Sequence, residues 1–176
     1  MNVLTNARAG NLAGFLACTA MMGFALYSQH VLGLEPCPLC VFQRVATIAL
    51  GALFLVAALH NPAGFGRVVY GVLLFATAAA GVGLAGRHVW LQSLPADQVP
   101  ACGPDLDFML ETFPLTEVLG TVLSGSGECA EVSWRFLGLT MPAWVLVLLA
   151  ALGGWALWTN RPARREKTVS RAAGSA

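Results

Sequence analysis

Four apolar segments of about 18 to 21 residues constrain the fold more than any other feature of this sequence. They cover roughly residues 12–32, 41–59, 68–86 and 141–158. With a rise of about 1.5 Å per residue, a helix of this length crosses the roughly 30 Å hydrocarbon core of a bilayer. The third and fourth segments contain no charged residue. We therefore predict an all-α membrane protein, a bundle of four transmembrane helices.

The composition agrees with a membrane protein. Hydrophobic residues make up 57% of the 176 residues and charged residues 11%, whereas about 25% of the residues of an average soluble domain are charged. The net charge of +1 gives no sign of nucleic-acid binding. The first apolar segment is too long for a cleaved signal peptide, so we interpret it as a span. We expect one integral membrane domain covering residues 1–176.

The basic residues divide unevenly between the two sides of this predicted bundle. Seven lie at the chain ends and between the second and third segments, namely Arg8, Arg67, Arg161, Arg164, Arg165, Lys167 and Arg171. Three lie on the other side, namely Arg44, Arg87 and Arg135. Cytoplasmic loops are enriched in Lys and Arg. We therefore expect both termini, including the tail 159–176, in the cytoplasm and the loops 33–40 and 87–140 on the outer side.

The second outer loop is too apolar to be a flexible linker. Its apolar residues recur at i, i+3, i+4, i+7 and i+8, namely Leu115, Val118, Leu119, Val122 and Leu123. This spacing predicts a short amphipathic helix. Such a helix either lies in the membrane interface or packs on the outer ends of the bundle, and the pattern fits both arrangements.

Four of the five cysteines fall in the two outer loops. Cys37 and Cys40 lie in the first, and Cys102 and Cys129 lie in the second. The orientation rests on the basic residues alone, and it places these four on the side where disulfides form and persist. Cys18 lies within the first apolar segment, and we interpret it as a small buried side chain.

Three interpretations of the loop cysteines imply different chemistry. Structural disulfides are one, but a C-x-x-C pair closes a very small ring and stabilises a fold little. A zinc site is another, but twenty-six residues separate Cys102 from Cys129, unlike the closely spaced pairs of zinc knuckles. We therefore expect no metal. C-x-x-C spacing is typical of reactive dithiols, which favours thiol–disulfide exchange between the two pairs.

The position of Cys40 also favours redox chemistry. It lies at or just before the first turn of the second predicted helix, where the positive end of the helix dipole stabilises a thiolate. Arg44 follows at i+4 on the same helix face. A charged residue in a span indicates function by default, although anchoring at the interface also explains Arg44.

The electrons of a dithiol need an acceptor. The chain has no dinucleotide-binding glycine pattern, no C-x-x-C-H haem motif and no iron–sulfur spacing. A membrane-soluble two-electron acceptor suits a cysteine at the outer rim of an apolar bundle, and quinones are such acceptors.

Several motifs resemble, in order, those of the bacterial DsbB family of disulfide bond formation proteins. They are EPCPLCVFQR, GRHVWLQ, CGPDLDFMLETFPL and SGSGECAEVSWRFLGLTMPAW. The resemblance runs from the first to the fourth apolar segment. It implies a multi-pass enzyme of the bacterial inner membrane with periplasmic redox loops. Such an enzyme oxidises a periplasmic thioredoxin-like protein (DsbA-like) and reduces ubiquinone or menaquinone of the membrane quinone pool.

The resemblance also implies roles for the loop cysteines. Cys37–Cys40 and Cys102–Cys129 would be the two redox disulfides. Cys102 would form the mixed disulfide with the partner, and Cys129 would then exchange with Cys37. Cys40 would be the thiolate that meets the quinone.

Two further residues match positions that the family places near the quinone. Arg44 would polarise the quinone, and His88 would lie near it at the outer end of the third helix. Gln29 and His30 are weaker candidates for the same site. Read without the resemblance, His88 is equally explained as a polar anchor at the interface.

Two alternatives differ in function. A vitamin K epoxide reductase-like enzyme also combines a helical bundle, C-x-x-C and quinone chemistry, but the order of elements fits less well. A four-helix membrane scaffold with structural disulfides is the non-enzymatic alternative. Its cysteine pairs would stay oxidised when a dithiol substrate is added.

Overall fold

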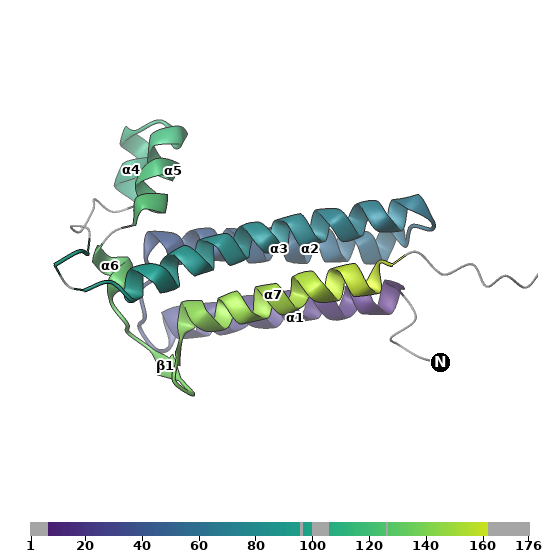
Figure 1. Ribbon diagram of the computed structural model, residues 1–176, viewed down its shortest axis with the longest axis horizontal. Helices are drawn as coiled ribbons and strands as arrows, with labels where there is room; N and C mark the ends of the chain where they lie inside the picture. Colours follow the sequence, from purple (N-terminus) through teal and green to yellow (C-terminus); the bar gives the residue numbers. More distant parts are fainter. Residues whose placement is uncertain (1–6, 96, 100–105, 126, 162–176) are drawn as a thin grey trace, which may run out of the picture.

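Four long helices form the body of the molecule in this computed structural model, which describes residues 7–95, 97–99, 106–125 and 127–161 (Figure 1). They are α1 Ala7–His30, α2 Pro38–His60, α3 Phe65–Gln92 and α7 Met141–Thr159. Each is long and apolar enough to cross a membrane. The prediction of an all-α, four-helix membrane protein is confirmed. Helix α3 continues to Gln92, so residues 87–92, which we expected in the second outer loop, are helical.

The short elements gather at one end of the bundle (Figure 1). They are α4 Leu106–Thr112, α5 Leu115–Ser124, α6 Gly127–Ala130, β1 Arg135–Phe136 and β2 Leu139–Thr140. We call this the cysteine end, because the C-x-x-C pair lies there at the start of α2. The first and last described residues lie at the opposite end, which we call the terminal end.

Helix α5 is the amphipathic helix expected from the sequence. Val118 and Val122 are buried, and they share an apolar cluster with Leu39 of α2 and Leu91 of α3. Leu115, at the start of the same stripe, remains exposed. The buried face of α5 therefore packs on the end of the bundle, while its exposed leucines are open to the surroundings.

The ends of α2 follow from its sequence. Cys37 is the N-cap residue in an extended conformation, and Pro38 occupies the first helical turn, where its fixed φ suits helix initiation. Asn61 ends the helix with a left-handed φ of 42°, a conformation that asparagine adopts more readily than most residues. The local sequence thus places both cysteines at the positive end of α2.

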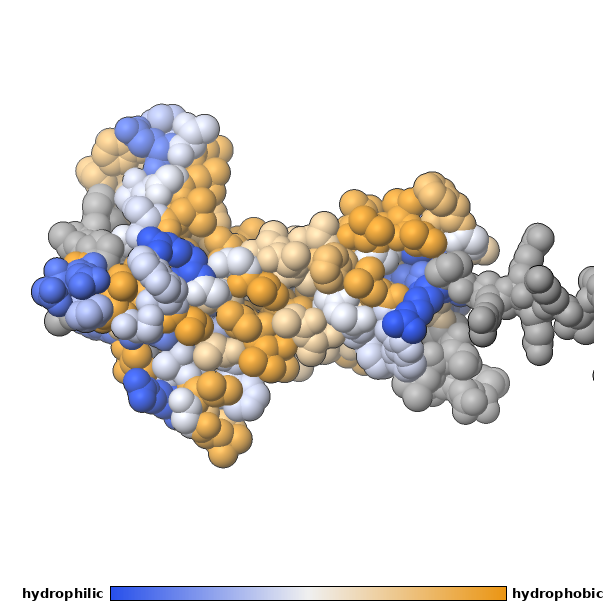
Figure 2. Space-filling model, viewed as in Figure 1, coloured by the Kyte–Doolittle hydropathy of each residue, from blue (hydrophilic) through white to orange (hydrophobic). Residues whose placement is uncertain are grey.

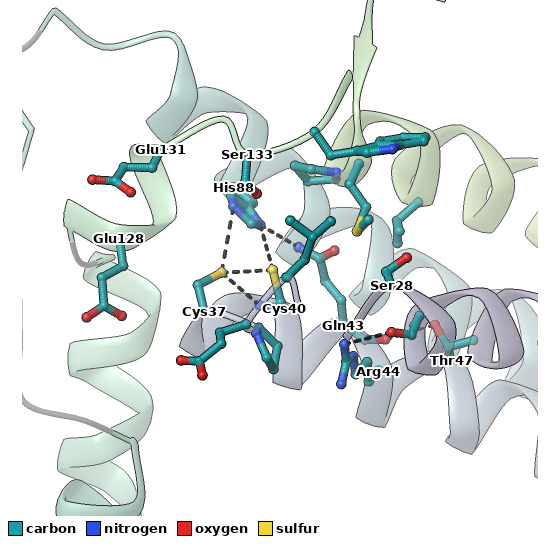
Figure 3. A pocket seen from close by; sticks show the side chains of 18 of the residues that line it. Ser28, Cys37, Cys40, Gln43, Arg44, Thr47, His88, Glu128, Glu131 and Ser133 are labelled. Atoms are coloured by element: carbon teal, nitrogen blue, oxygen red, sulfur yellow. Dashed lines mark hydrogen bonds between the residues drawn. The ribbon is translucent and has the colours of Figure 1, made fainter. Parts of the chain in front are cut away.

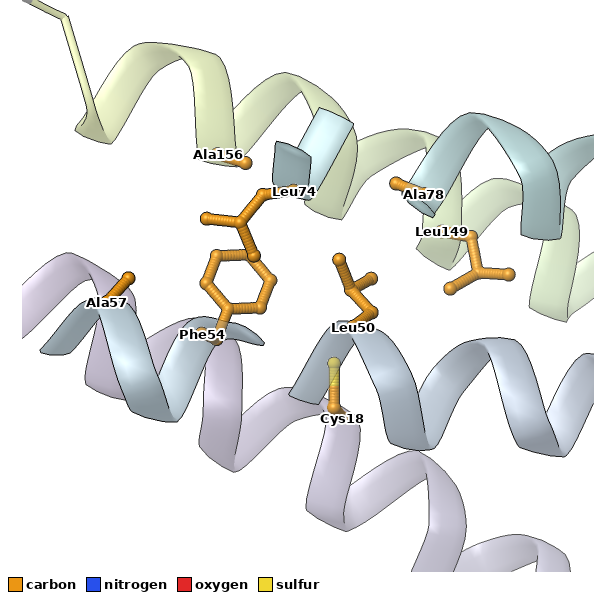
Figure 4. Packing of buried hydrophobic residues seen from close by; sticks show 8 residues of the cluster. All are labelled: Cys18, Leu50, Phe54, Ala57, Leu74, Ala78, Leu149 and Ala156. Carbon is orange, nitrogen blue, oxygen red and sulfur yellow. The ribbon is translucent and has the colours of Figure 1, made fainter. Parts of the chain in front are cut away.

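A compact apolar cluster holds the four helices together (Figure 4). Leu50 and Phe54 of α2 lie between residues of the other three helices, namely Cys18, Leu74, Ala78, Leu149 and Ala156. Small residues allow this close approach. A Cβ atom on Gly14 would lie 2.7 Å from the Phe54 ring. Helix packing in membranes typically uses small residues in this way. As expected, Cys18 is buried.

The surface has the polarity of a membrane-spanning bundle. Figure 2 shows hydrophobic residues along the middle of the visible face and hydrophilic residues towards both ends. Lipid-facing helix surfaces are apolar because acyl chains offer no hydrogen bonds. The described part of the chain therefore has the surface expected of a multi-pass membrane protein.

A polar clasp joins the first and last long helices near the terminal end. The side-chain amides of Asn11 and Asn160 donate to each other, with N–O distances of 3.2 and 3.0 Å. Both residues are buried. Trp155 adds a hydrogen bond from its indole nitrogen to the Gly10 carbonyl at 2.9 Å. These contacts fix α1 against α7 at this end.

The Asn11–Asn160 pair should couple energetically. We expect Asn11→Leu and Asn160→Leu to show a coupling free energy of about 1 kcal/mol in a double-mutant cycle, typical of hydrogen bonds between membrane helices. The free energies of unfolding of the wild type, the two single variants and the double variant in mixed micelles give this coupling free energy. Thr77→Leu is the control, because the hydroxyl of half-buried Thr77 donates within its own helix, to the Leu73 carbonyl. Strictly additive effects of the two asparagine variants would contradict the coupling.

Candidate functional site

The C-x-x-C pair meets a buried histidine at the cysteine end (Figure 3). Cys37 and Cys40 have their Sγ atoms 2.8 Å apart. The imidazole of His88 lies over both sulfurs, with Nε2 3.8 Å from Cys37 Sγ and Nδ1 4.0 Å from Cys40 Sγ. His88 comes from α3, so two helices build this cluster.

Both cysteine sulfurs lie at the N-terminus of α2. Cys40 lies in the first turn of the helix, and its backbone N–H donates to Cys37 Sγ at 3.4 Å. From the sequence alone, only Cys40 was expected at the helix N-terminus. The structure adds that Cys37, as the N-cap residue, also receives a helix N–H. A donor of this kind stabilises negative charge on the Cys37 sulfur.

His88 is held in one orientation by Gln43. The side-chain amide of Gln43 donates to Nδ1 of His88 at 3.0 Å, and both residues are buried. A ring nitrogen that accepts a hydrogen bond carries no proton, so the proton of the neutral ring lies on Nε2, facing Cys37. The contacts of His88 are therefore those of a proton-holding group beside the dithiol rather than of an exposed anchor.

Arg44 crosses from α2 to α1. Its guanidinium donates to Oε1 of Gln29 and, at 3.2 Å, to the Ala25 carbonyl. Gln29, a weaker candidate from the sequence, is thus a direct partner of Arg44, whereas His30 is exposed at the end of α1. An arginine held across the bundle in this way does not have the free side chain of a snorkelling anchor.

The second cysteine pair is described in part. Cys129 of α6 is 1% exposed and belongs to the apolar cluster against which Cys37 packs. His88 also interacts with the backbone of Cys129. The structure therefore brings three of the four loop cysteines and His88 together. Cys102 lies outside the described residues, and so does the predicted Cys102–Cys129 disulfide.

A cavity of about 120 Å³ opens beside the dithiol. Cys37, Cys40, Arg44 and His88 are among the residues that line it. It adjoins an apolar groove of about 650 Å³ between α1 and α7. Four residues line both, namely Met21, Trp134, Met141 and Val145. The cavity beside the dithiol and the apolar groove are therefore direct neighbours.

Two glutamines of this cavity escaped the sequence analysis. Gln43 lies three residues after Cys40, and Gln92 lies four residues after His88, so each shares a helix face with a candidate site residue. Gln92 Oε1 is buried and has no hydrogen-bond partner among the described residues. The i+3 and i+4 spacing could have indicated these two residues. Glutamines near helix ends are common, however, so the spacing alone did not identify them.

Loss of the Gln43 amide should change the reactivity of Cys37. We expect Gln43→Leu to lower the rate of Cys37 alkylation roughly tenfold near neutral pH, because His88 loses the bond that fixes its ring. The reduced protein, treated with iodoacetamide over a range of pH values, gives this rate by peptide mass spectrometry. Thr47→Val is the control, because the Thr47 hydroxyl bonds to the backbone carbonyl of Gln43. Equal rates in wild type and Gln43→Leu would show that the amide is not needed.

Comparisons with known proteins agree on one family. The family model described as "Disulfide bond formation protein DsbB" matches residues 7–159. "Disulfide bond formation protein B" of Nitrosococcus oceani is 61% identical over 145 residues, 82% of this chain and 86% of that protein. The protein of the same name from Chromobacterium violaceum is 55% identical over 159 residues, 88% of this chain and 96% of that protein. That from Hahella chejuensis is 56% identical over 150 residues, covering 84% and 91% respectively.

Proposed function

Because this chain belongs to the DsbB family of disulfide bond formation proteins, and is a redox catalyst on that ground, we propose that it oxidises a thioredoxin-like dithiol protein of the periplasm and passes the two electrons to a membrane quinone. One observation carries the second half of this proposal. The C-x-x-C dithiol opens into a cavity that adjoins an apolar groove facing the lipid. A lipid-borne acceptor could therefore approach the dithiol from the apolar groove.

Two disulfide exchanges would move the electrons within the protein. A thiolate of the partner attacks Cys102 of the Cys102–Cys129 disulfide, and the partner's second thiolate then releases the partner as a disulfide. Both chain cysteines are left reduced. Cys129 next attacks Cys37, and Cys40 leaves as a thiolate. Cys102 then reforms its bond with Cys129, so that Cys37 and Cys40 carry the two electrons. The packing of Cys37 against the buried cluster that contains Cys129 supports the second exchange.

The residues around the cavity fit a molecule with a polar head and an apolar tail. Arg44, Gln92 and His88 line the cavity and would surround the polar head. The unpartnered Gln92 Oε1 could accept a hydrogen bond from a hydroxyl of the reduced quinol, since the carbonyl oxygens of the quinone are themselves acceptors. The groove between α1 and α7 would take an isoprenoid tail. A bound quinone, ubiquinone or menaquinone, supplies an acceptor for two electrons and two protons. His88 would hold a proton beside Cys37, and Arg44 would stabilise negative charge at the cavity.

The proposal includes an orientation in the membrane. The cysteine end would face the periplasm, and both termini would lie in the cytoplasm, with the bundle in the inner membrane. The excess of Lys and Arg in residues 1–11, 60–67 and 159–176 over the outer loops supports this orientation. The described chain ends lie together at the terminal end, as this arrangement requires.

The two alternatives are less well supported. The match of a DsbB family model to residues 7–159 favours a DsbB enzyme over a vitamin K epoxide reductase-like one. A scaffold with structural disulfides does not explain why a dithiol, a buried histidine and an arginine share one cavity.

Anaerobic mixing of the purified protein with quinone and a reduced DsbA-like protein tests the proposed function. We expect one quinone to be reduced for each partner disulfide formed. The loss of quinone absorbance measures the reduction. Parallel reactions with ubiquinone and menaquinone compare the two acceptors. Partner oxidation without any quinone reduction in either reaction would overturn the proposal.

A further inference from the structure

The hairpin formed by β1 and β2 carries an apolar tip that the proposed redox function does not use. The strands pair in antiparallel register, with Phe136 opposite Leu139 and Arg135 opposite Thr140. Directly opposed residues share a face, so Phe136 and Leu139 form an apolar face and Arg135 and Thr140 a polar one. Leu137 at the tip is 77% exposed. Figure 1 shows this hairpin projecting from the bundle on the side opposite α4 and α5.

The turn itself is unfavourable for its sequence. Leu137 and Gly138 both have positive φ, 51° and 82°, as in the two-residue turns that favour Asn-Gly. A leucine in the left-handed region is strained. Local turn preference therefore does not account for a leucine here, and its side chain gains nothing from burial within the described protein.

Contacts to two long helices fix the depth of the hairpin. Trp134, just before β1, packs edge-on against Phe24 of α1 with ring centroids 5.7 Å apart. Phe136 lies 6.3 Å from the Trp144 ring of α7, whose indole nitrogen donates to the Phe136 carbonyl at 3.1 Å. Phe24 lies six residues from the end of α1 at His30, and Trp144 three residues from the start of α7. These spacings correspond to about 9 and 4.5 Å along a helix.

That depth matches the boundary between headgroups and acyl chains. Interfacial segments bury their apolar face about 5–10 Å into this region, and Trp is enriched there. The apolar face adjoins the outer surface of α7, because Phe136 lines the same apolar groove as Trp144 and Leu148. Arg135 on the polar face suits the headgroup region. Figure 2 shows hydrophobic residues on this projection, as on the middle of the bundle.

We propose that the β1–β2 hairpin is a membrane anchor, with Leu137 and Phe136 inserted among the lipids of the leaflet at the cysteine end. The occupant of its apolar face is phospholipid, not a protein partner. Trp134 lines both the cavity and the apolar groove. Anchoring the hairpin would therefore hold in place a residue shared by the cavity and the groove.

Site-specific photo-crosslinking tests the anchor independently of any redox activity. Benzoylphenylalanine replaces Leu137 in the full chain, in nanodiscs of phosphatidylethanolamine and phosphatidylglycerol, with and without a reduced DsbA-like protein. We expect a phospholipid adduct by mass spectrometry in both samples. Lipid-facing Val147 of α7 is the positive control, and exposed Gln98 of the outer loop is the negative control. A protein adduct at position 137, or no more lipid adduct than at position 98, would overturn the proposal.

A second variant separates anchoring from turn formation. Leu137→Asn places a preferred residue in the turn and removes the apolar tip. With benzoylphenylalanine at position 136, the yield of lipid adduct should fall roughly tenfold in Leu137→Asn, because an amide replaces a large apolar side chain. The melting temperature in micelles should not fall. An unchanged adduct yield would show that Leu137 does not hold the hairpin in the membrane.

Discussion

Replacing Cys40 with serine should abolish quinone reduction by a reduced DsbA-like protein, with a loss of roughly a thousandfold or more. Serine cannot form the Cys37–Cys40 disulfide, so the chain has no redox couple facing the cavity. The Cys37 thiolate can still attack Cys129 of the Cys102–Cys129 disulfide and release Cys102 as a thiolate, but no Cys40 thiol is present to break the new bond. We therefore expect a Cys37–Cys129 disulfide to accumulate in this variant, detectable in peptides by mass spectrometry. Its formation follows from the packing of Cys37 on the cluster around Cys129.

Cys18→Ser is the matched control for this experiment. Cys18 is buried in the apolar cluster at the centre of the bundle and is not among the residues that line the cavity. Its replacement should change stability slightly and leave the rate of quinone reduction unchanged. Full quinone reduction by Cys40→Ser would remove Cys40 from the proposed mechanism.

Replacing Arg44 with methionine should lower kcat/KM for quinone roughly a hundredfold, the usual cost of removing one charged donor from a site where negative charge develops. Methionine keeps much of the side-chain volume but cannot donate to Gln29 or Ala25. Arg44→Lys should recover part of the loss, because lysine keeps the charge without the planar fork that reaches two acceptors. Steady-state rates over a range of quinone concentrations measure these effects.

Arg87→Met is the matched control for Arg44. Arg87 is also a cation near the cysteine end, but it bonds to the carbonyls of Leu123 and Ser124 and stacks on Trp90. Its loss should weaken the attachment of α5 to α3. It should leave kcat/KM for quinone within about twofold of the wild-type value, since Arg87 makes no polar contact at the cavity. An effect as large as that of Arg44→Met would indicate a general electrostatic effect rather than a contact at the cavity.

The spans were predictable because hydropathy depends on composition within a short window. Each of the four apolar segments falls within a long helix, except that residues 31–32 of the first lie beyond the end of α1, and the spacing of Val118 and Val122 predicted the amphipathic helix α5. The ends of the helices were less accessible. Helix α3 continues through His88 to Gln92, beyond the apolar segment, because polar residues at the rim of a bundle remain helical when they face a cavity or other helices.

The site was predictable as a list of residues but not as an arrangement. The sequence indicated Cys37, Cys40 and Arg44 by their spacing, and the family resemblance added His88. Which nitrogen of His88 faces which sulfur depends on how α2 and α3 are rotated about their axes, and so does its bond from Gln43. No pattern within one helix contains that rotation. The hairpin was missed for a different reason, since Leu-Gly lacks the usual signal of a two-residue turn.

The Asn11–Asn160 clasp has a consequence for biogenesis. Its two halves are 149 residues apart in sequence and belong to the first and last spans. During insertion, the Asn11 amide enters the bilayer long before its partner has been synthesised. A chain stopped before α7 therefore lacks the partner of the Asn11 side chain, and the flank of α1 that packs on α7 is uncovered. The pairing of the first and last spans thus becomes possible only once the whole bundle has been made.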